Sequence, residues 1–109
     1  MTEARDHATF SGGERWSIEG ALTIDSAARV FAASRAAPMP SSGIASLELV
    51  RTVDSSAVAL LLAWKRRAAE ESKTLAFTGI PLNLAALAAL YGVEELLASD
   101  GAGQRPVAA

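Results

Sequence analysis

The sequence predicts an α/β fold in which a small mixed β-sheet has helices packed mainly on one face. Three observations indicate this class. Short segments of β-favouring residues alternate with longer apolar segments of helical period, in the expected order β-β-α-β-α-β-α-α. The chain has 109 residues, the size of one domain, and 50% of them are hydrophobic. It has no cysteine, so the core is expected to be stable without disulfides.

Two short strands open the predicted fold. Residues 8–10 and 15–19 hold β-favouring side chains on either side of a Ser-Gly-Gly-Glu segment, which predicts a hairpin with a glycine-containing turn. A helix is predicted next. Thr23, Asp25 or Ser26 can cap it, because each offers a side-chain oxygen to the free N–H groups of the first turn.

The following apolar segment has no helix breakers, which predicts a central strand buried on both faces. Its apolar residues are Ile44, Leu47, Leu49 and Val50. Asp54, Ser55 and Ser56 come next, and capping residues directly before an apolar run predict the start of a helix. This helix is expected to continue to about Ser72, with its apolar first half buried.

The last part of the predicted fold is a short strand and two helices. The strand is predicted over residues 74–78, and Pro81 after Gly79 predicts a new helix, because proline fits a first helical turn. One apolar stripe of this helix is expected to face the core. The residues of that stripe are Leu84, Leu87 and Leu90 or Tyr91. A final helix over residues 93–98 is expected to direct Leu96 and Leu97 inward.

Composition excludes several classes of function. The 12 acidic and 10 basic residues give a net charge of -2, without the basic stripe that a nucleic-acid binder needs. No cysteine and a single histidine, His7, leave no metal site, so no metal and no cofactor are expected. No G-x-S-x-G elbow and no phosphate-binding glycine loop is present, so we expect no catalytic residues.

The chain is expected to lie in the cytosol without inserting into a membrane. Its longest apolar run, residues 57–64, is far shorter than the ~20 residues of a transmembrane helix. The N-terminus has no apolar stretch of the kind found in secretory signals. One domain is expected over residues 8–100, with flexible termini at 1–7 and 101–109.

The turn Asp54-Ser55-Ser56 is the strongest candidate for a functional site. As an N-cap, Asp54 or Ser55 would stabilise the helix by about 1 kcal/mol. Two hydroxyls at a strand-to-helix turn also suit an added phosphate, because the N-terminal end of a helix carries partial positive charge. If the turn were only a cap, a partner surface is expected on the flank of the same helix formed by Trp64 and Arg67.

Two blocks of sequence resemble the STAS domain family. Gly20-Ala21-Leu22-Thr23 precedes the first helix, and Val53-Asp54-Ser55-Ser56 precedes the second. The stretch 53–64, Leu75-Ala76-Phe77 and the block from Leu87 to Leu97 are more similar to the MlaB branch of the family. The resemblance covers Trp16 to Ala98 and implies a STAS-like fold.

The resemblance implies a role for Ser55, with Asp54 and Ser56 beside it. In the anti-sigma-factor antagonists of the family, a partner kinase phosphorylates the hydroxyl residue at this position. In MlaB-like proteins, the same position contacts the ATPase subunit of an ABC transporter. The chain has Ala57 where members commonly have glycine.

The leading functional hypothesis is therefore a non-enzymatic subunit that binds and stabilises or regulates the ATPase of a phospholipid-transporting ABC complex. Such a complex maintains outer-membrane lipid asymmetry, and this subunit would be cytoplasmic, peripheral to the inner membrane through its complex. The alternative is an antagonist of an anti-sigma factor kinase, controlled by serine phosphorylation. The expected partner-binding or phosphorylation residues are Ser55, Asp54, Ser56, Trp64 and Arg67.

Overall fold

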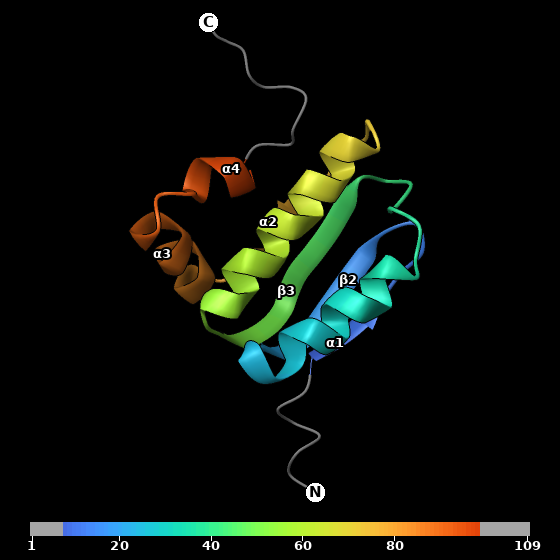
Figure 1. Cartoon of the computed structure of the whole chain (residues 1–109). Coiled ribbons are helices and arrows are strands. Elements are labelled where there is room, and N and C mark those ends of the chain that lie inside the picture. Colours follow the sequence, from blue (N-terminus) through green and yellow to red (C-terminus); the bar gives the residue numbers. More distant parts are fainter. Residues whose placement is uncertain (1–7, 99–109) are drawn as a thin grey trace, which may run out of the picture.

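The computed structural model describes residues 8–98 (Figure 1). The segments expected to be flexible, 1–7 and 101–109, lie outside the described residues. The predicted order β-β-α-β-α-β-α-α is confirmed. The elements are β1 (Ala8–Ser11), β2 (Trp16–Leu22), α1 (Ile24–Arg35), β3 (Ile44–Val53), α2 (Ser55–Glu70), β4 (Ala76–Thr78), α3 (Leu82–Leu90) and α4 (Glu94–Ala98).

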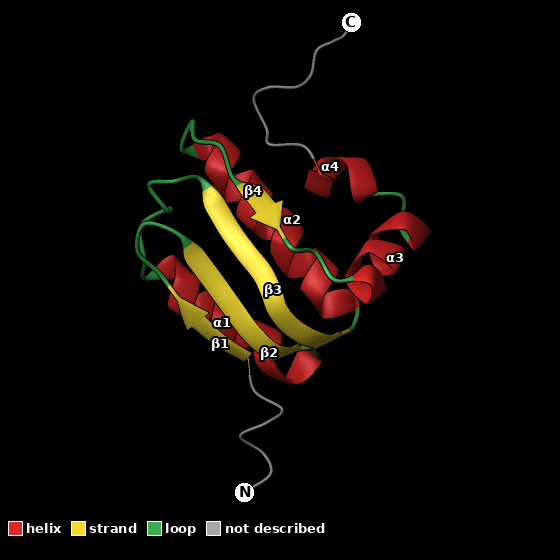
Figure 2. Ribbon diagram, turned by 180° about the vertical axis from the view of Figure 1, so that it is seen from behind, coloured by secondary structure: helices red, strands yellow, loops and turns green. Residues whose placement is uncertain are grey.

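The four strands form one mixed sheet in the order β1-β2-β3-β4. β1 and β2 form the predicted antiparallel hairpin, whereas β2 with β3 and β3 with β4 are parallel. α1 and α2 make the two crossovers between the parallel strands and cover the same face of the sheet (Figure 2). α3 and α4 contact α2 on the side away from α1. The predicted fold class is therefore confirmed.

β3 corrects one expectation, because it is not buried on both faces. Leu47 is fully buried and Val50 is 4% exposed, but Leu49 is 55% exposed. The pairing of β2 with β3 has two register shifts, and at the first of them Leu49 comes opposite the exposed Glu19. Since side chains alternate between the faces of a strand and an extra residue changes that alternation, Leu49 lies outside the core.

An aromatic cluster forms the centre of the core. Trp16 and Trp64 have no exposed surface, and their ring centroids are 5.2 Å apart in an edge-to-face arrangement. Phe10 lies 5.0 Å from Trp16, and Phe77 lies 6.4 Å from Trp64. Rings from β1, β2, α2 and β4 thus meet between the sheet and the helices, where edge-to-face contacts add to the burial of apolar surface.

In the two C-terminal helices, the residues that face the core differ in part from those predicted. In α3, Leu84 is fully buried and Ala88 is 2% exposed, whereas Leu90 is 74% exposed and Tyr91 beyond the helix is 51% exposed. In α4, Leu97 is buried and Leu96 points outward. A helix that is apolar on every side gives no periodic signal to select its buried face, so the predicted stripe was wrong at its C-terminal end. Within residues 8–98, no helix combines the length and apolar character needed to cross a membrane.

Candidate functional site

The carboxylate of Asp54 caps two helices at once. Its Oδ1 accepts a hydrogen bond of 2.8 Å from the backbone N–H of Ser56, in the first turn of α2. Its Oδ2 accepts a hydrogen bond of 2.9 Å from the backbone N–H of Ile24, the first residue of α1. The predicted cap of α2 is therefore confirmed, and the same side chain satisfies a free donor of a helix that begins thirty residues earlier.

A second contact anchors the start of α1 to the sheet. The Ser26 hydroxyl accepts a hydrogen bond of 3.1 Å from the Thr23 N–H and donates one of 2.6 Å to the carbonyl of Ala21 in β2. Ser26 is 1% exposed, so the hydroxyl fulfils both roles inside the protein. Of the three candidates that the sequence offered, Thr23 is the N-cap residue, and Ser26 acts as the third residue of a capping box.

Ser55 lies where the two helices start. It is exposed, while Asp54 and Ser56 on either side are partly buried. The free N–H groups of two helices converge here, and each helix start carries about half a positive charge. The single carboxylate of Asp54 balances this charge from one side. Of the predicted site residues, the structure thus brings Asp54, Ser55 and Ser56 together.

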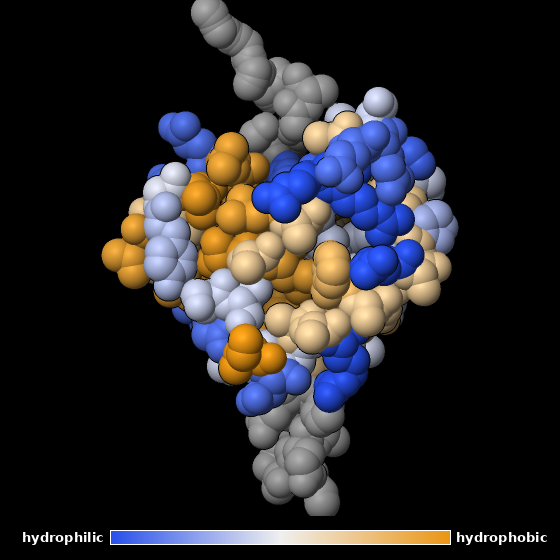
Figure 3. Space-filling model, viewed as in Figure 1, coloured by the Kyte–Doolittle hydropathy of each residue, from blue (hydrophilic) through white to orange (hydrophobic). Residues whose placement is uncertain are grey.

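An apolar groove begins at this turn and runs between α1 and α2. Its volume is about 260 Å³. The lining residues are Ala27, Ala28, Phe31, Ser56, Ala59, Leu60 and Ala63. Figure 3 shows pale orange, alanine-rich surface between the two helices. Phe31 is 36% exposed in the groove, and Ile24 at the start of α1 is 70% exposed.

Sequence reasoning missed this groove, because its walls come from segments about thirty residues apart. One signal was present in the sequence: small residues lie at helical spacing on α2, at Ala59 and Ala63, and small residues also lie on α1, at Ala27 and Ala28. Small side chains on facing helices leave a depression unless large ones fill it.

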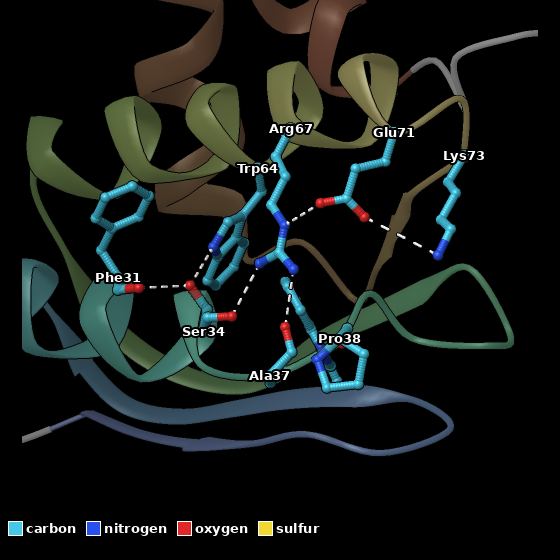
Figure 4. A network of polar contacts seen from close by, with 9 residues as sticks. Phe31, Ser34, Ala37, Pro38, Trp64, Arg67, Glu71 and Lys73 are labelled. Carbon is cyan, nitrogen blue, oxygen red and sulfur yellow. Dashed lines mark hydrogen bonds and ion pairs between the residues drawn. The ribbon is translucent and has the colours of Figure 1, made fainter.

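Trp64 and Arg67 join α2 to the C-terminal end of α1 (Figure 4). The Trp64 indole Nε1–H donates to the Ser34 hydroxyl at 2.8 Å. Arg67 donates from Nη1 to the Ser34 carbonyl at 2.9 Å and from Nη2 to the Ala37 carbonyl at 2.8 Å. The two Arg67 bonds reach carbonyls at and just beyond the C-terminal end of α1, and the Ser34 carbonyl also accepts from the Ala37 N–H at 3.0 Å.

This network corrects the expectation that Trp64 and Arg67 form a partner-binding surface. Trp64 has no exposed surface, so its side chain is not available to a partner. The predicted partner surface placed Trp64 on an exposed flank of the helix, but the indole points from α2 towards α1. Arg67 is partly buried and makes contacts within the domain, which shows a structural role for its guanidinium.

Comparison with known protein families identifies the family of the chain. Residues 11–98 match the family described as "Mlab, STAS domain". The chain belongs to the STAS domain family. No curated protein matches its sequence. Membership identifies a regulatory or interaction module, and STAS domains are generally non-catalytic. Between residues 8 and 98 of this STAS domain, no three His, Cys, Asp or Glu residues are grouped to hold a metal ion.

One ion pair on the surface of this STAS domain makes its stability depend on pH. Arg67 Nε donates to Glu71 Oε2 at 2.7 Å, and this hydrogen bond holds the pKa of Glu71 below its usual value. A lowered carboxylate pKa contributes stability above the pKa of the unfolded state, and that stability is lost as the pH falls through the folded pKa.

We therefore expect Glu71→Gln to lower the free energy of unfolding at neutral pH by a small amount, because the pair is exposed. The difference from the parent protein should shrink as the pH falls through the folded pKa of Glu71. Urea unfolding at about pH 7 and about pH 3 measures it. Glu70→Gln is the control, since Glu70 is exposed on the same turn. Equal effects of the two substitutions at both pH values would contradict the prediction.

Proposed function

We propose that this STAS domain binds and stabilises or regulates the ATPase subunit of a phospholipid-transporting ABC complex that maintains outer-membrane lipid asymmetry. It acts without catalysis of its own, and it lies in the cytoplasm, held at the inner membrane through the complex. The observation that carries the proposal is that the exposed Ser55 directly precedes Ser56, which lines the apolar groove between α1 and α2.

The shape and chemistry of this surface suit a protein partner. The groove is open and shallow, and its lining is mostly alanine with one aromatic ring, Phe31. A protruding apolar side chain of an ATPase subunit would fill it, and Ile24 beside it would add apolar contact. The Ser55 hydroxyl at one end can hydrogen-bond the partner and set its register. Apolar anchors with a polar rim are typical of protein interfaces.

A second candidate function uses the same surface. An antagonist of an anti-sigma factor would present Ser55 to a partner kinase, and the exposed position of this residue favours that reading. A phosphate on Ser55 would be attracted by the two helix starts and repelled by the carboxylate of Asp54. The two functions differ in the partner, so the partner is what an experiment must identify.

We expect Ser55→Asp to weaken binding to the ATPase subunit by about tenfold or more, which corresponds to about 1.4 kcal/mol. The new carboxylate adds charge beside Asp54 and alters the rim of the groove, whereas Ser55→Ala removes only a hydroxyl and should have a smaller effect. The matched control is Ser41→Asp, because Ser41 is exposed in the loop before β3, at the other end of that strand from Ser55.

The experiment has two steps. The tagged full chain is first purified from its native cell, and the co-purifying proteins show whether a transporter ATPase or an anti-sigma factor kinase is the partner. That partner is then titrated with each variant. Ala59→Glu, which places a charge in the groove, should weaken binding, and Ala69→Glu on another side of α2 should not. Unchanged affinity for both Ser55→Asp and Ala59→Glu would overturn the assignment of this surface.

A further inference from the structure

The outward side of α3 is apolar and uncovered. Leu82 is 88% exposed and Leu90 is 74% exposed, one at each end of the helix. Ala86 and Ala89 lie between them, and all four residues are on the outward side. The spacing i, i+4, i+7 and i+8 places them on one stripe, opposite the buried Leu84. In Figure 3 hydrophobic residues lie on the side of α3 and α4, next to a pale, weakly hydrophilic strip over α3, while hydrophilic residues gather around the C-terminal end of α2.

The segment that contains α3 also lacks charge. Residues 74–93 contain no Asp, Glu, Lys or Arg. Contiguous exposed apolar surface on a small domain marks an interaction site. A lipid surface is a poor fit, because helices that lie on membranes carry Lys and Arg to contact anionic headgroups, and the nearest charges after α3 are Glu94 and Glu95.

The charge distribution along α3 is complementary to itself. The helix begins at Pro81, which has no side chain able to cap it, so the N-terminal end of α3 keeps its partial positive charge. Glu94 and Glu95 follow the opposite end and are exposed. An antiparallel copy of α3 would bring these carboxylates towards the uncapped helix start of the other chain. A parallel arrangement would bring like charges together.

We propose that α3 is a self-association surface, on which a second copy of this chain packs its own α3 antiparallel about a two-fold axis. Leu82 of each copy then contacts Leu90 of the other copy. Within one helix these two leucines are eight residues, or about 12 Å, apart along the axis. The alanines between them let the helices approach to about 8 Å. The contact is isologous, so it closes at a dimer.

This association goes beyond the proposed function and does not compete with it. α3 lies on the opposite side of α2 from α1, so a dimer through α3 leaves the groove and Ser55 accessible. Because α3 is a helix of nine residues, the contact area is small, and we expect a weak, concentration-dependent dimer.

Sedimentation equilibrium of the full chain over a range of concentrations tests the proposal. We expect a reversible monomer–dimer equilibrium, with a dissociation constant raised about tenfold or more by Leu90→Glu. Leu49→Glu is the matched control, because it makes the same change at an exposed leucine in β3 and should leave the equilibrium unchanged. A parent chain that stays monomeric throughout, or an equal loss in both variants, would overturn the proposal.

A charge pair tests the antiparallel geometry. Leu82→Lys and Leu90→Glu should each weaken the dimer, and the double variant should regain much of the loss, because the introduced lysine of one copy would face the introduced glutamate of the other. The two positions are two turns apart on one helix, so they do not pair within a chain. Both positions are exposed, and far-UV circular dichroism verifies that each variant is folded. A double variant as weak as the worse single variant would contradict this geometry.

Discussion

Replacing Trp64 with alanine is expected to lower the free energy of unfolding by about 3 to 5 kcal/mol, the range for large aromatic residues in a packed core. Trp64 has no exposed surface and contacts the rings of Trp16, Phe10 and Phe77. Its removal leaves a cavity at the centre of this cluster. It also removes the N–H that donates to Ser34, and with it one link between α1 and α2.

Trp64→Phe separates the two causes. Phenylalanine keeps an aromatic ring in the cluster but has no N–H, so we expect a loss well below that of the alanine variant. Urea unfolding followed by far-UV circular dichroism is the suitable measurement, because the substitution changes the fluorescence of the protein. A loss for Trp64→Ala below about 0.5 kcal/mol, the usual size for surface substitutions, would show that the indole is not in the core.

Asp54→Ala is expected to destabilise the domain by about 1 to 4 kcal/mol, since one cap contributes about 0.5 to 2 kcal/mol and Asp54 caps two helices. Asp54→Asn is the comparison, because asparagine keeps one acceptor oxygen and has an NH2 donor in place of the other. It can retain one of the two caps, so we expect a loss about half that of Asp54→Ala. Chemical denaturation of the three proteins gives the differences in unfolding free energy.

Amide hydrogen exchange distinguishes a double cap from a single one. In Asp54→Ala, the amides of Ile24 and Ser56 should both exchange faster, because each loses its acceptor. Faster exchange at Ser56 alone would mean that Asp54 caps only α2 and that the start of α1 is held by Ser26 and Thr23.

Of the two hydrogen bonds that Asp54 accepts, the one within its own turn could be predicted from the sequence, and the one from the distant Ile24 could not. A capping residue before an apolar run predicted the hydrogen bond that the Asp54 carboxylate accepts from the turn that follows it. The bond to Ile24 joins residues thirty positions apart, and it exists because β2 and β3 are parallel neighbours that end at the same edge of the sheet. The pattern of neighbouring residues in the sequence carries no information about a contact between two segments so far apart.

The faces of elements were harder to predict than their order. Alternating segments and turn residues indicated every strand and helix in sequence. Trp64 was assigned to a partner-binding flank, yet its indole is directed towards α1 and has no exposed surface. In α3, leucine and alanine occur on all sides, so only the packing against α2 determines that Leu84 is buried and Leu90 is not.

The shared cap has a consequence for how the groove can change shape. Its two walls, α1 and α2, are tied at one end to the same carboxylate, and at the other end Trp64 and Arg67 tie them again. The walls therefore cannot spread at one end without breaking a bond that also holds a helix terminus. The groove should therefore keep nearly its present width when a partner binds, which favours a partner whose shape already matches the groove.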